Sequence, residues 1–137
     1  MNYIFVDMSY YCFYRYYAIY SWYKRINNIN KEDNLLENEI FRNKYDELFI
    51  KRMDEMIKKF KIDKFKFYIA RDCKRSEIWR HNIYENYKGN RNNNDKNIGN
   101  FINHSYNNLI PIMIKKYNGK TLYIDKLEAD DCVSIYV

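Results

Sequence analysis

Three short runs of β-favouring residues, each leading into a carboxylate, most constrain how this chain can fold. Residues 3–6 end in Asp7, residues 65–70 are followed by Asp72, and residues 122–124 lead on to Glu128. The segments between the runs have the spacing and length of helices, and connections of this kind join parallel strands by right-handed crossovers. The sequence therefore predicts an α/β fold with a mostly parallel sheet flanked by helices.

Three helices are expected around this sheet. The segment 9–24 should be capped by Ser9 and, being apolar almost all round, largely buried. The segment 34–60 carries one apolar face and has Asn34 as its expected N-cap. The segment 98–117 also has helical spacing, but Pro111 should kink it or divide it in two.

Length and composition fit one folded domain with a single core. The chain has 137 residues, of which 47% are hydrophobic and 19% aromatic, which excludes a multidomain enzyme and a disordered tail. Cys12, Cys73 and Cys132 are odd in number and lack metal-ligand spacing, so we expect small buried thiols in a reducing compartment. No apolar run could span a bilayer and Asp7 interrupts any signal peptide, so the protein is expected to be soluble and intracellular.

The carboxylates predict a metal site. Ligands bind at the carboxyl ends of parallel strands, which is where the sequence places Asp7, Asp72, Glu128, Asp130 and Asp131. Oxygen ligands without His or Cys favour Mg²⁺ or Mn²⁺. On an ideal helix Asp130 would point about 100° away from Asp131. Two alternatives stay open: an acidic first turn that complements a helix dipole, and isolated cap or loop residues at Asp7 and Asp72.

Basic and aromatic residues follow Asp72. Trp79-Arg80-His81 and Tyr87-Lys88-Gly89-Asn90-Arg91 alternate cations with aromatic rings, a pattern that suits phosphate binding and base stacking. The net charge of +6 also suits a polyanionic partner. The alternative is an ordinary basic surface loop.

These segments together resemble a known family. Ile4-Phe5-Val6-Asp7-Met8-Ser9 with Phe13-Tyr14-Arg15, then Asp72 followed by Trp79-Arg80, then Tyr87-Lys88-Gly89-Asn90-Arg91 and finally Glu128-Ala129-Asp130-Asp131 are similar in order and spacing to the 5′-nucleases. These are the flap endonucleases and 5′-3′ exonucleases of phages, bacterial DNA polymerase I and large DNA viruses. The combination of the Tyr87–Arg91 motif with the Glu128–Asp131 motif is specific to this family.

The resemblance implies a PIN-like (Rossmann-like) fold and Mg²⁺-dependent hydrolysis of DNA at a 5′ single-stranded flap or end, leaving 5′-phosphate and 3′-hydroxyl ends. It implies a first acidic cluster of metal ligands at Asp7, Asp72, Glu128, Asp130 and Asp131. It implies catalytic cations at Lys88 and Arg91 that contact the scissile phosphate, Tyr87 near the unpaired nucleotide, and Arg80 as a further phosphate contact. Residues 89–117 would form part of a helical arch, and a viral member would act in the viral replication compartment.

The resemblance departs at the C-terminus. Family members continue with a strand bearing two more aspartates and a helix-three-turn-helix module, whereas this chain ends at Val137, shortly after Asp131. Residues 1–137 are therefore expected to form a single incomplete domain whose activity alone is uncertain. Two other functions stay open: a noncatalytic nucleic-acid-binding fragment completed by a second chain, and a PIN-type ribonuclease.

Overall fold

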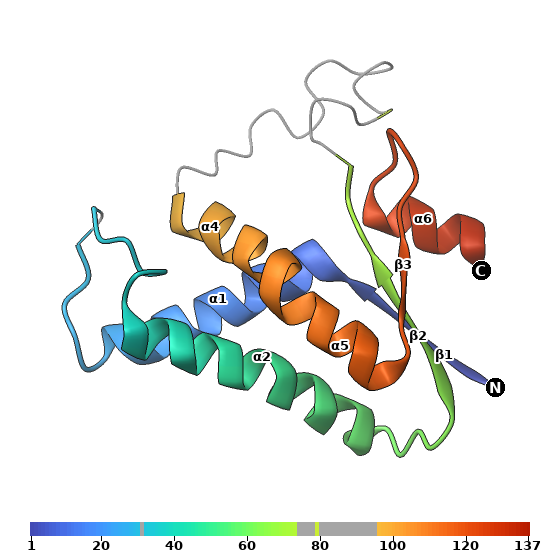
Figure 1. The fold of residues 1–137 in the computed structure, drawn as a ribbon, viewed down its shortest axis with the longest axis horizontal. Helices are drawn as coiled ribbons and strands as arrows, with labels where there is room; N and C mark the ends of the chain where they lie inside the picture. The colour runs from blue at the N-terminus through green and yellow to red at the C-terminus, as the bar shows by residue number, and fades with distance from the viewer. Residues whose placement is uncertain (31, 74–78, 80–95) are drawn as a thin grey trace.

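A three-stranded parallel sheet lies between helices in the computed structural model, which describes residues 1–30, 32–73, 79 and 96–137 (Figure 1). The strands are β1 (Asn2–Asp7), β2 (Phe65–Ala70) and β3 (Lys120–Leu122), in the order β1-β2-β3. The predicted α/β class and parallel pairing are confirmed.

The strand register places the three carboxyl ends at one edge of the sheet. Asp7 pairs with Ala70, which in turn pairs with Leu122. The third strand starts and ends two residues earlier than predicted. Asn118 caps the preceding helix with a left-handed backbone (φ 50°), and Gly119 then passes so close to Phe67 that a Cβ would lie 3.0 Å from its ring. The chain therefore enters the sheet directly at Lys120.

Two long helices follow β1, and both begin at a different cap from the one predicted. Helix α1 (Met8–Lys24) is capped by Asp7, whose carboxylate accepts from the Tyr10 amide at 3.3 Å, because the strand runs straight into the helix. Helix α2 (Glu39–Lys59) is capped by Asn38, which accepts from the Phe41 amide at 3.1 Å. Asn34 instead lies before a turn at 35–37 that precedes the helix.

Helix α1 is buried on one side only, so the expectation of a largely buried helix was wrong. Tyr11, Tyr16 and Ile19 face the core, whereas Tyr10 and Tyr14 are 66% and 58% exposed. Tyrosine can lie at a surface because its hydroxyl stays hydrated while its ring packs along neighbouring residues.

The segment around Pro111, which the sequence predicted to be kinked or divided in two, is an unbroken helical run that changes type just before the proline. Helix α4 (Lys96–His104), the π-helical turn η2 (Ser105–Leu109) and helix α5 (Ile110–Tyr117) follow one another, with Pro111 in the first turn of α5. Ser105 donates its hydroxyl proton to the Phe101 carbonyl at 2.7 Å, so Tyr45 must donate to Ser105. Of the predicted arch 89–117, α4 packs against α1, η2 against α2 and α5 against β2, and residues 89–95 lie outside the described part.

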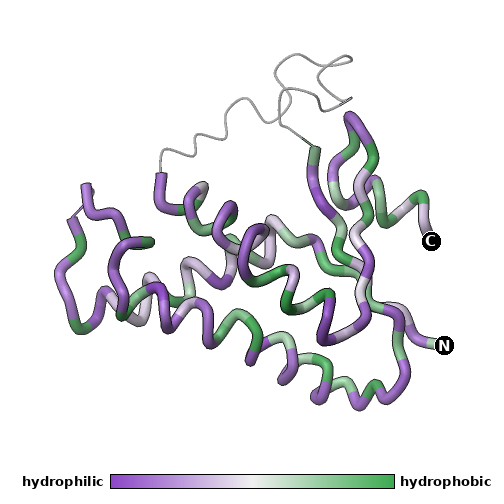
Figure 2. Tube along the Cα trace, in the orientation of Figure 1, coloured by the Kyte–Doolittle hydropathy of each residue, from purple (hydrophilic) through white to green (hydrophobic). Residues whose placement is uncertain are grey.

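Aromatic rings fill the core on one face of the sheet, and helix α6 (Ala129–Tyr136) covers the other. Phe41 and Phe101 are fully buried with ring centroids 5.3 Å apart. On the opposite face the Tyr136 ring lies 4.7 Å from Tyr68 and 5.8 Å from Phe5. Figure 2 shows hydrophobic residues along the strands and a largely hydrophilic connection between α1 and α2.

Replacing Phe41 by alanine tests this core. Phe41 is 0% exposed, and truncating a buried phenylalanine costs about 3–5 kcal/mol through lost burial and an unfilled cavity. Ile40, the preceding residue, is 66% exposed, and Ile40→Ala should change the free energy of unfolding by less than about 0.5 kcal/mol. Urea denaturation measures the free energy of unfolding of both variants. Equal losses of stability in Phe41→Ala and Ile40→Ala would contradict this assignment of the core.

Candidate metal centre

The segment after β2 carries Asp72 to the N-terminus of α6. The Arg71 amide donates to the Leu122 carbonyl at 2.9 Å, and the Cys73 amide donates to the Leu127 carbonyl at 3.1 Å. These bonds hold residues 71–73 alongside the chain that leaves β3. The Asp72 carboxylate then accepts from the Ala129 amide at 2.7 Å.

Acidic side chains also cap the first turn of α6. Glu128 is the N-cap, and its side chain accepts from the Asp131 amide while the Asp131 carboxylate accepts from the Glu128 amide at 3.2 Å. The Asp130 carboxylate accepts from the Asp131 amide at 2.9 Å. The acidic first turn weighed in the sequence analysis therefore has a structural role, because carboxylates satisfy the orphan amides and complement the helix dipole.

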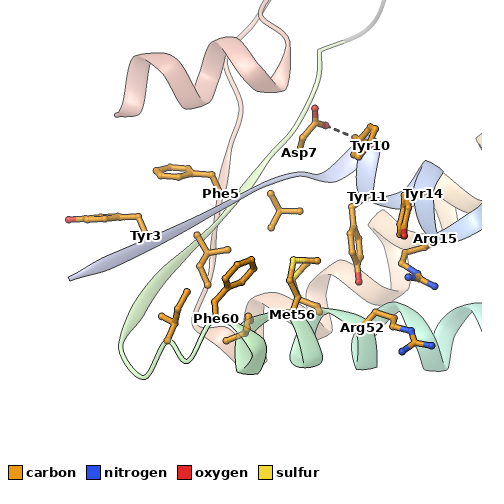
Figure 3. Close-up of a pocket in the computed structure, with 15 residues that line it drawn as sticks. Tyr3, Phe5, Asp7, Tyr10, Tyr11, Tyr14, Arg15, Arg52, Met56 and Phe60 are labelled. Atoms are coloured by element: carbon orange, nitrogen blue, oxygen red, sulfur yellow. Dashed lines mark hydrogen bonds between the residues drawn. The ribbon is translucent and has the colours of Figure 1, made fainter. Parts of the chain in front are cut away.

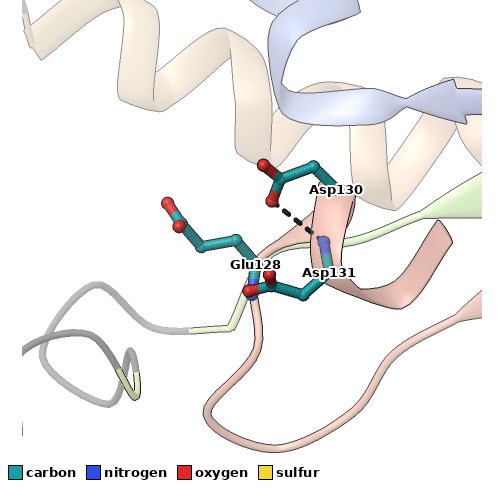
Figure 4. A group of neighbouring side chains, drawn as sticks. All are labelled: Glu128, Asp130 and Asp131. Carbon is teal, nitrogen blue, oxygen red and sulfur yellow. Dashed lines mark hydrogen bonds between the residues drawn. The ribbon is translucent and has the colours of Figure 1, made fainter. Parts of the chain in front are cut away.

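The same three carboxylates form the candidate metal centre (Figure 4). Glu128, Asp130 and Asp131 each offer an oxygen within 4.8 Å of the others. The predicted angle of about 100° between Asp130 and Asp131 does not keep their carboxylate oxygens out of one group. Glu128 has an extended backbone (φ −80°, ψ 166°) and lies outside the helix, so helical angles do not govern its position.

The donor set fits a hard divalent cation. All three groups offer oxygen only, the donor type that Mg²⁺ and Mn²⁺ prefer, and their oxygens lie within 4.8 Å of one another. At 4–5 Å in water two carboxylates repel by about 1 kcal/mol, similar to the 0.3–1 kcal/mol each gains from the helix N-terminus. The turn can thus exist without an ion and still attract one.

Asp7 and Asp72 lie at the same edge of the sheet but outside this group of three. Among the residues that the structure describes, the oxygens gathered within 4.8 Å of one another are those of Glu128, Asp130 and Asp131. Asp7 is exposed at the end of β1, and Asp72 is half-buried against α6. Their roles as metal ligands stay predictions.

Trp79 has a positioning role that the sequence did not reveal. Its indole Nε1 donates to the Asp131 carboxylate at 3.0 Å, and its amide donates to the Lys126 carbonyl at 2.7 Å. Its position in the sequence, beside Arg80, predicted a place among phosphate-binding cations. No sequence spacing marks such a contact, since 52 residues separate the partners. Arg80, Tyr87, Lys88 and Arg91 lie outside the described residues, so their roles also stay predictions.

Arg71 is a second residue that sequence reasoning missed. Its guanidinium lies over the ring of Tyr106 from η2 and near the ring of Tyr123, which follows β3. Three segments distant in sequence thus meet beside Asp72. The only sequence signal was its position directly before that aspartate.

Two of the cysteines have raised thiol pKa values. Cys12, Cys73 and Cys132 are all buried, as predicted. Burial raises the pKa of Cys12 to about 11 and also raises the pKa of Cys132. Both thiols therefore stay protonated at neutral pH.

Comparison with known protein families agrees with this arrangement. Residues 2–137 match the N-terminal resolvase-like domain of 5′-3′ exonuclease. The chain belongs to this family. Domains of the 5′-3′ exonuclease family are typically metal-dependent and act on nucleic acid, and the acidic cluster described above is present in this member. No curated protein and no solved structure gave a significant match. None of the described helices is long and apolar enough to cross a membrane.

Two substitutions at Asp72 separate its contact to α6 from its charge. Asp72→Ala removes the acceptor for the Ala129 amide and should lower the free energy of unfolding by about 0.5–2 kcal/mol, as for other helix-capping residues. Asp72→Asn keeps an acceptor oxygen, so it should lower the free energy of unfolding by less than Asp72→Ala does. Thermal and urea unfolding measure both, and an alanine variant as stable as the wild type would show that this bond does not hold α6.

Proposed function

We propose that this domain is the metal-binding part of a structure-specific 5′-3′ DNA exonuclease or flap endonuclease. It would hydrolyse phosphodiesters with Mg²⁺ or Mn²⁺ and leave 5′-phosphate and 3′-hydroxyl ends. The observation that carries the proposal is the group of three carboxylate oxygens within 4.8 Å at the carboxyl edge of the sheet. Membership of the 5′-3′ exonuclease family supports it.

Glu128, Asp130 and Asp131 would hold the ion, with Asp7 and Asp72 facing the same edge. A bound Mg²⁺ supplies a nucleophilic hydroxide and offsets charge on the reacting phosphate. The protein's own contribution is to fix the ligands. Trp79 and the Glu128 amide orient Asp131, while the Asp72 bond holds the N-terminus of α6 against the end of β2.

The phosphate contacts rest on the motif resemblance. Lys88 and Arg91 would stabilise the charge that develops on the scissile phosphate, and Arg80 would bind a neighbouring phosphate. Tyr87 would stack near the unpaired nucleotide. The substrate would be DNA with a 5′ single-stranded flap or end.

Asp130→Asn tests the metal assignment. It keeps an oxygen that can accept from the Asp131 amide but removes the charge that an ion needs, so Mn²⁺ affinity should fall at least about tenfold. Product release from a 5′-labelled flap duplex should fall with it. The matched control is Asp63→Asn, which removes an exposed aspartate before β2, at the opposite edge of the sheet.

Mn²⁺ binding is followed by electron paramagnetic resonance, so the test does not depend on activity of the chain alone. Equal Mn²⁺ affinity in the wild type and Asp130→Asn would remove the metal assignment. Faster cleavage of single-stranded RNA than of flap DNA would favour the PIN-type ribonuclease.

A second candidate function is a fragment completed by another chain, and the free side of β1 favours it. Among the described strands β1 pairs only with β2. A mostly apolar groove of about 590 Å³ runs beside β1, α1 and α2 (Figure 3). Arg15 lies at one end of the groove, is 7% exposed, and has a buried Nε with no hydrogen-bond partner among the described residues. An added strand with an acceptor group would cover the edge and satisfy this nitrogen.

Met56→Glu tests this candidate. Met56 lines the groove and is 44% exposed, so a charge there should expel an apolar partner without unfolding the chain. Native mass spectrometry of the chain from its own source should show a second polypeptide at fixed stoichiometry, lost in Met56→Glu. Ile112→Glu, on exposed α5 surface away from the groove, should retain it. A wild-type chain of monomer mass would contradict the candidate.

A further inference from the structure

Arg71 occupies a fixed position at the carboxyl edge of the sheet. Its amide is bonded to the Leu122 carbonyl at 2.9 Å, so its backbone follows β3 beyond the last paired residues. The next residue, Asp72, is bonded to the first amide of α6. The side chain of Arg71 therefore starts beside the turn that carries the acidic group.

Two aromatic rings hold the guanidinium. Arg71 Cζ lies 4.7 Å from the ring centroid of Tyr106 and 5.9 Å from that of Tyr123. Ring contacts of this kind attract a cation through its face and leave the N–H groups at its edge available. They also restrict the side-chain rotamers, so less entropy is lost when the edge binds a ligand.

The positive charge of Arg71 is not neutralised within the described part of the chain. Neither a carboxylate of residues 1–30, 32–73 and 96–137 nor a phenolate pairs with it. Burial raises the pKa of Tyr106 to about 12, so this ring is neutral at physiological pH. Arg71 itself is exposed. An exposed, oriented guanidinium that pairs with none of the described carboxylates suits an anion that arrives from solvent.

The geometry points to Arg71 as a binding residue for a backbone phosphate of the nucleic acid, with Tyr106 and Tyr123 holding its guanidinium in place. This inference rests on the proposed function and adds to it a cation within the described fold. A phosphodiester that approaches Glu128, Asp130 and Asp131 meets negative charge, and Arg71 offers two parallel N–H groups to its oxygens at the same edge.

Arg71→Met tests the inference. Methionine keeps an apolar stem against the two rings and removes the charge. The probe is a 5′-fluorescein 20-nucleotide DNA strand in Ca²⁺ without Mg²⁺, followed by fluorescence anisotropy from 25 to 200 mM KCl. Affinity should fall about five- to twentyfold at low salt, and the slope of log affinity against log salt should shrink by about 0.7, as for one lost phosphate contact.

Lys66→Met is the matched control. Lys66 is an exposed cation 6.0 Å from the ring centroid of Tyr3, but it lies towards the amino ends of the strands. Its loss changes the net charge equally, so it reports general electrostatic steering. Arg71→Met with the affinity and salt slope of Lys66→Met would overturn the inference.

Tyr123→Ala provides a second variant, since Tyr123 is 45% exposed and its loss should be tolerated. Removing this ring should weaken binding while keeping the salt slope, because the charge remains but is less well held. Unchanged affinity in Tyr123→Ala would contradict its positioning role.

Failure of this inference and failure of the proposed function are distinguishable. Asp130→Asn should lose Mn²⁺ binding and flap cleavage, whereas Arg71→Met should keep Mn²⁺ affinity and lose DNA affinity. If cleavage is lost in Asp130→Asn but Arg71→Met binds DNA as the wild type does, only the phosphate-binding role of Arg71 is rejected. Weaker binding in Arg71→Met, with Mn²⁺ affinity unaffected by Asp130→Asn, would reject the metal site alone.

Discussion

The amide groups at the N-terminus of α6 hold the candidate site together. Asp72 accepts from Ala129, Asp131 accepts from Glu128, and Glu128 accepts from Asp131. Each bond satisfies an amide that the helix leaves unpaired and draws a carboxylate into the same small volume. A carboxylate has two oxygens and can accept several bonds, so capping the helix and binding a cation are compatible uses of one side chain.

The two faces of the sheet divide structural and functional roles. On one face, α1, α2, α4 and α5 enclose an aromatic core, which fixes the strands and their register. On the other, α6 lies across the strands through Tyr136 and presents its N-terminus at their carboxyl ends. Rigid elements thus determine the position of the acidic turn. A site that holds several ligands within a few ångströms of one another needs such rigid support.

Some features followed from local sequence alone. The apolar runs before Asp7 and Asp72 predicted the first two strands, and Pro111 predicted an irregularity in the helical segment, which lies at η2 between α4 and α5. The helix caps were harder, because Asn34 and Asn38 are equally good capping residues. Asn38 caps α2, and its side-chain Nδ2 also donates to the Tyr23 hydroxyl at 2.8 Å, a contact with α1 that forms only after the helices pack.

The sequence by itself determined the fold class and the chemical type of the candidate site. Residue order and spacing specified parallel strands, carboxylates at the carboxyl edge of the sheet, and oxygen donors suited to a hard cation. Only the tertiary structure decided which side chains meet there. It brought the Trp79 indole into hydrogen-bond contact with Asp131 and placed the Arg71 guanidinium near the rings of Tyr106 and Tyr123. Such contacts link positions far apart in the chain, and their partners come together only when the strands pair and α6 folds back onto the sheet.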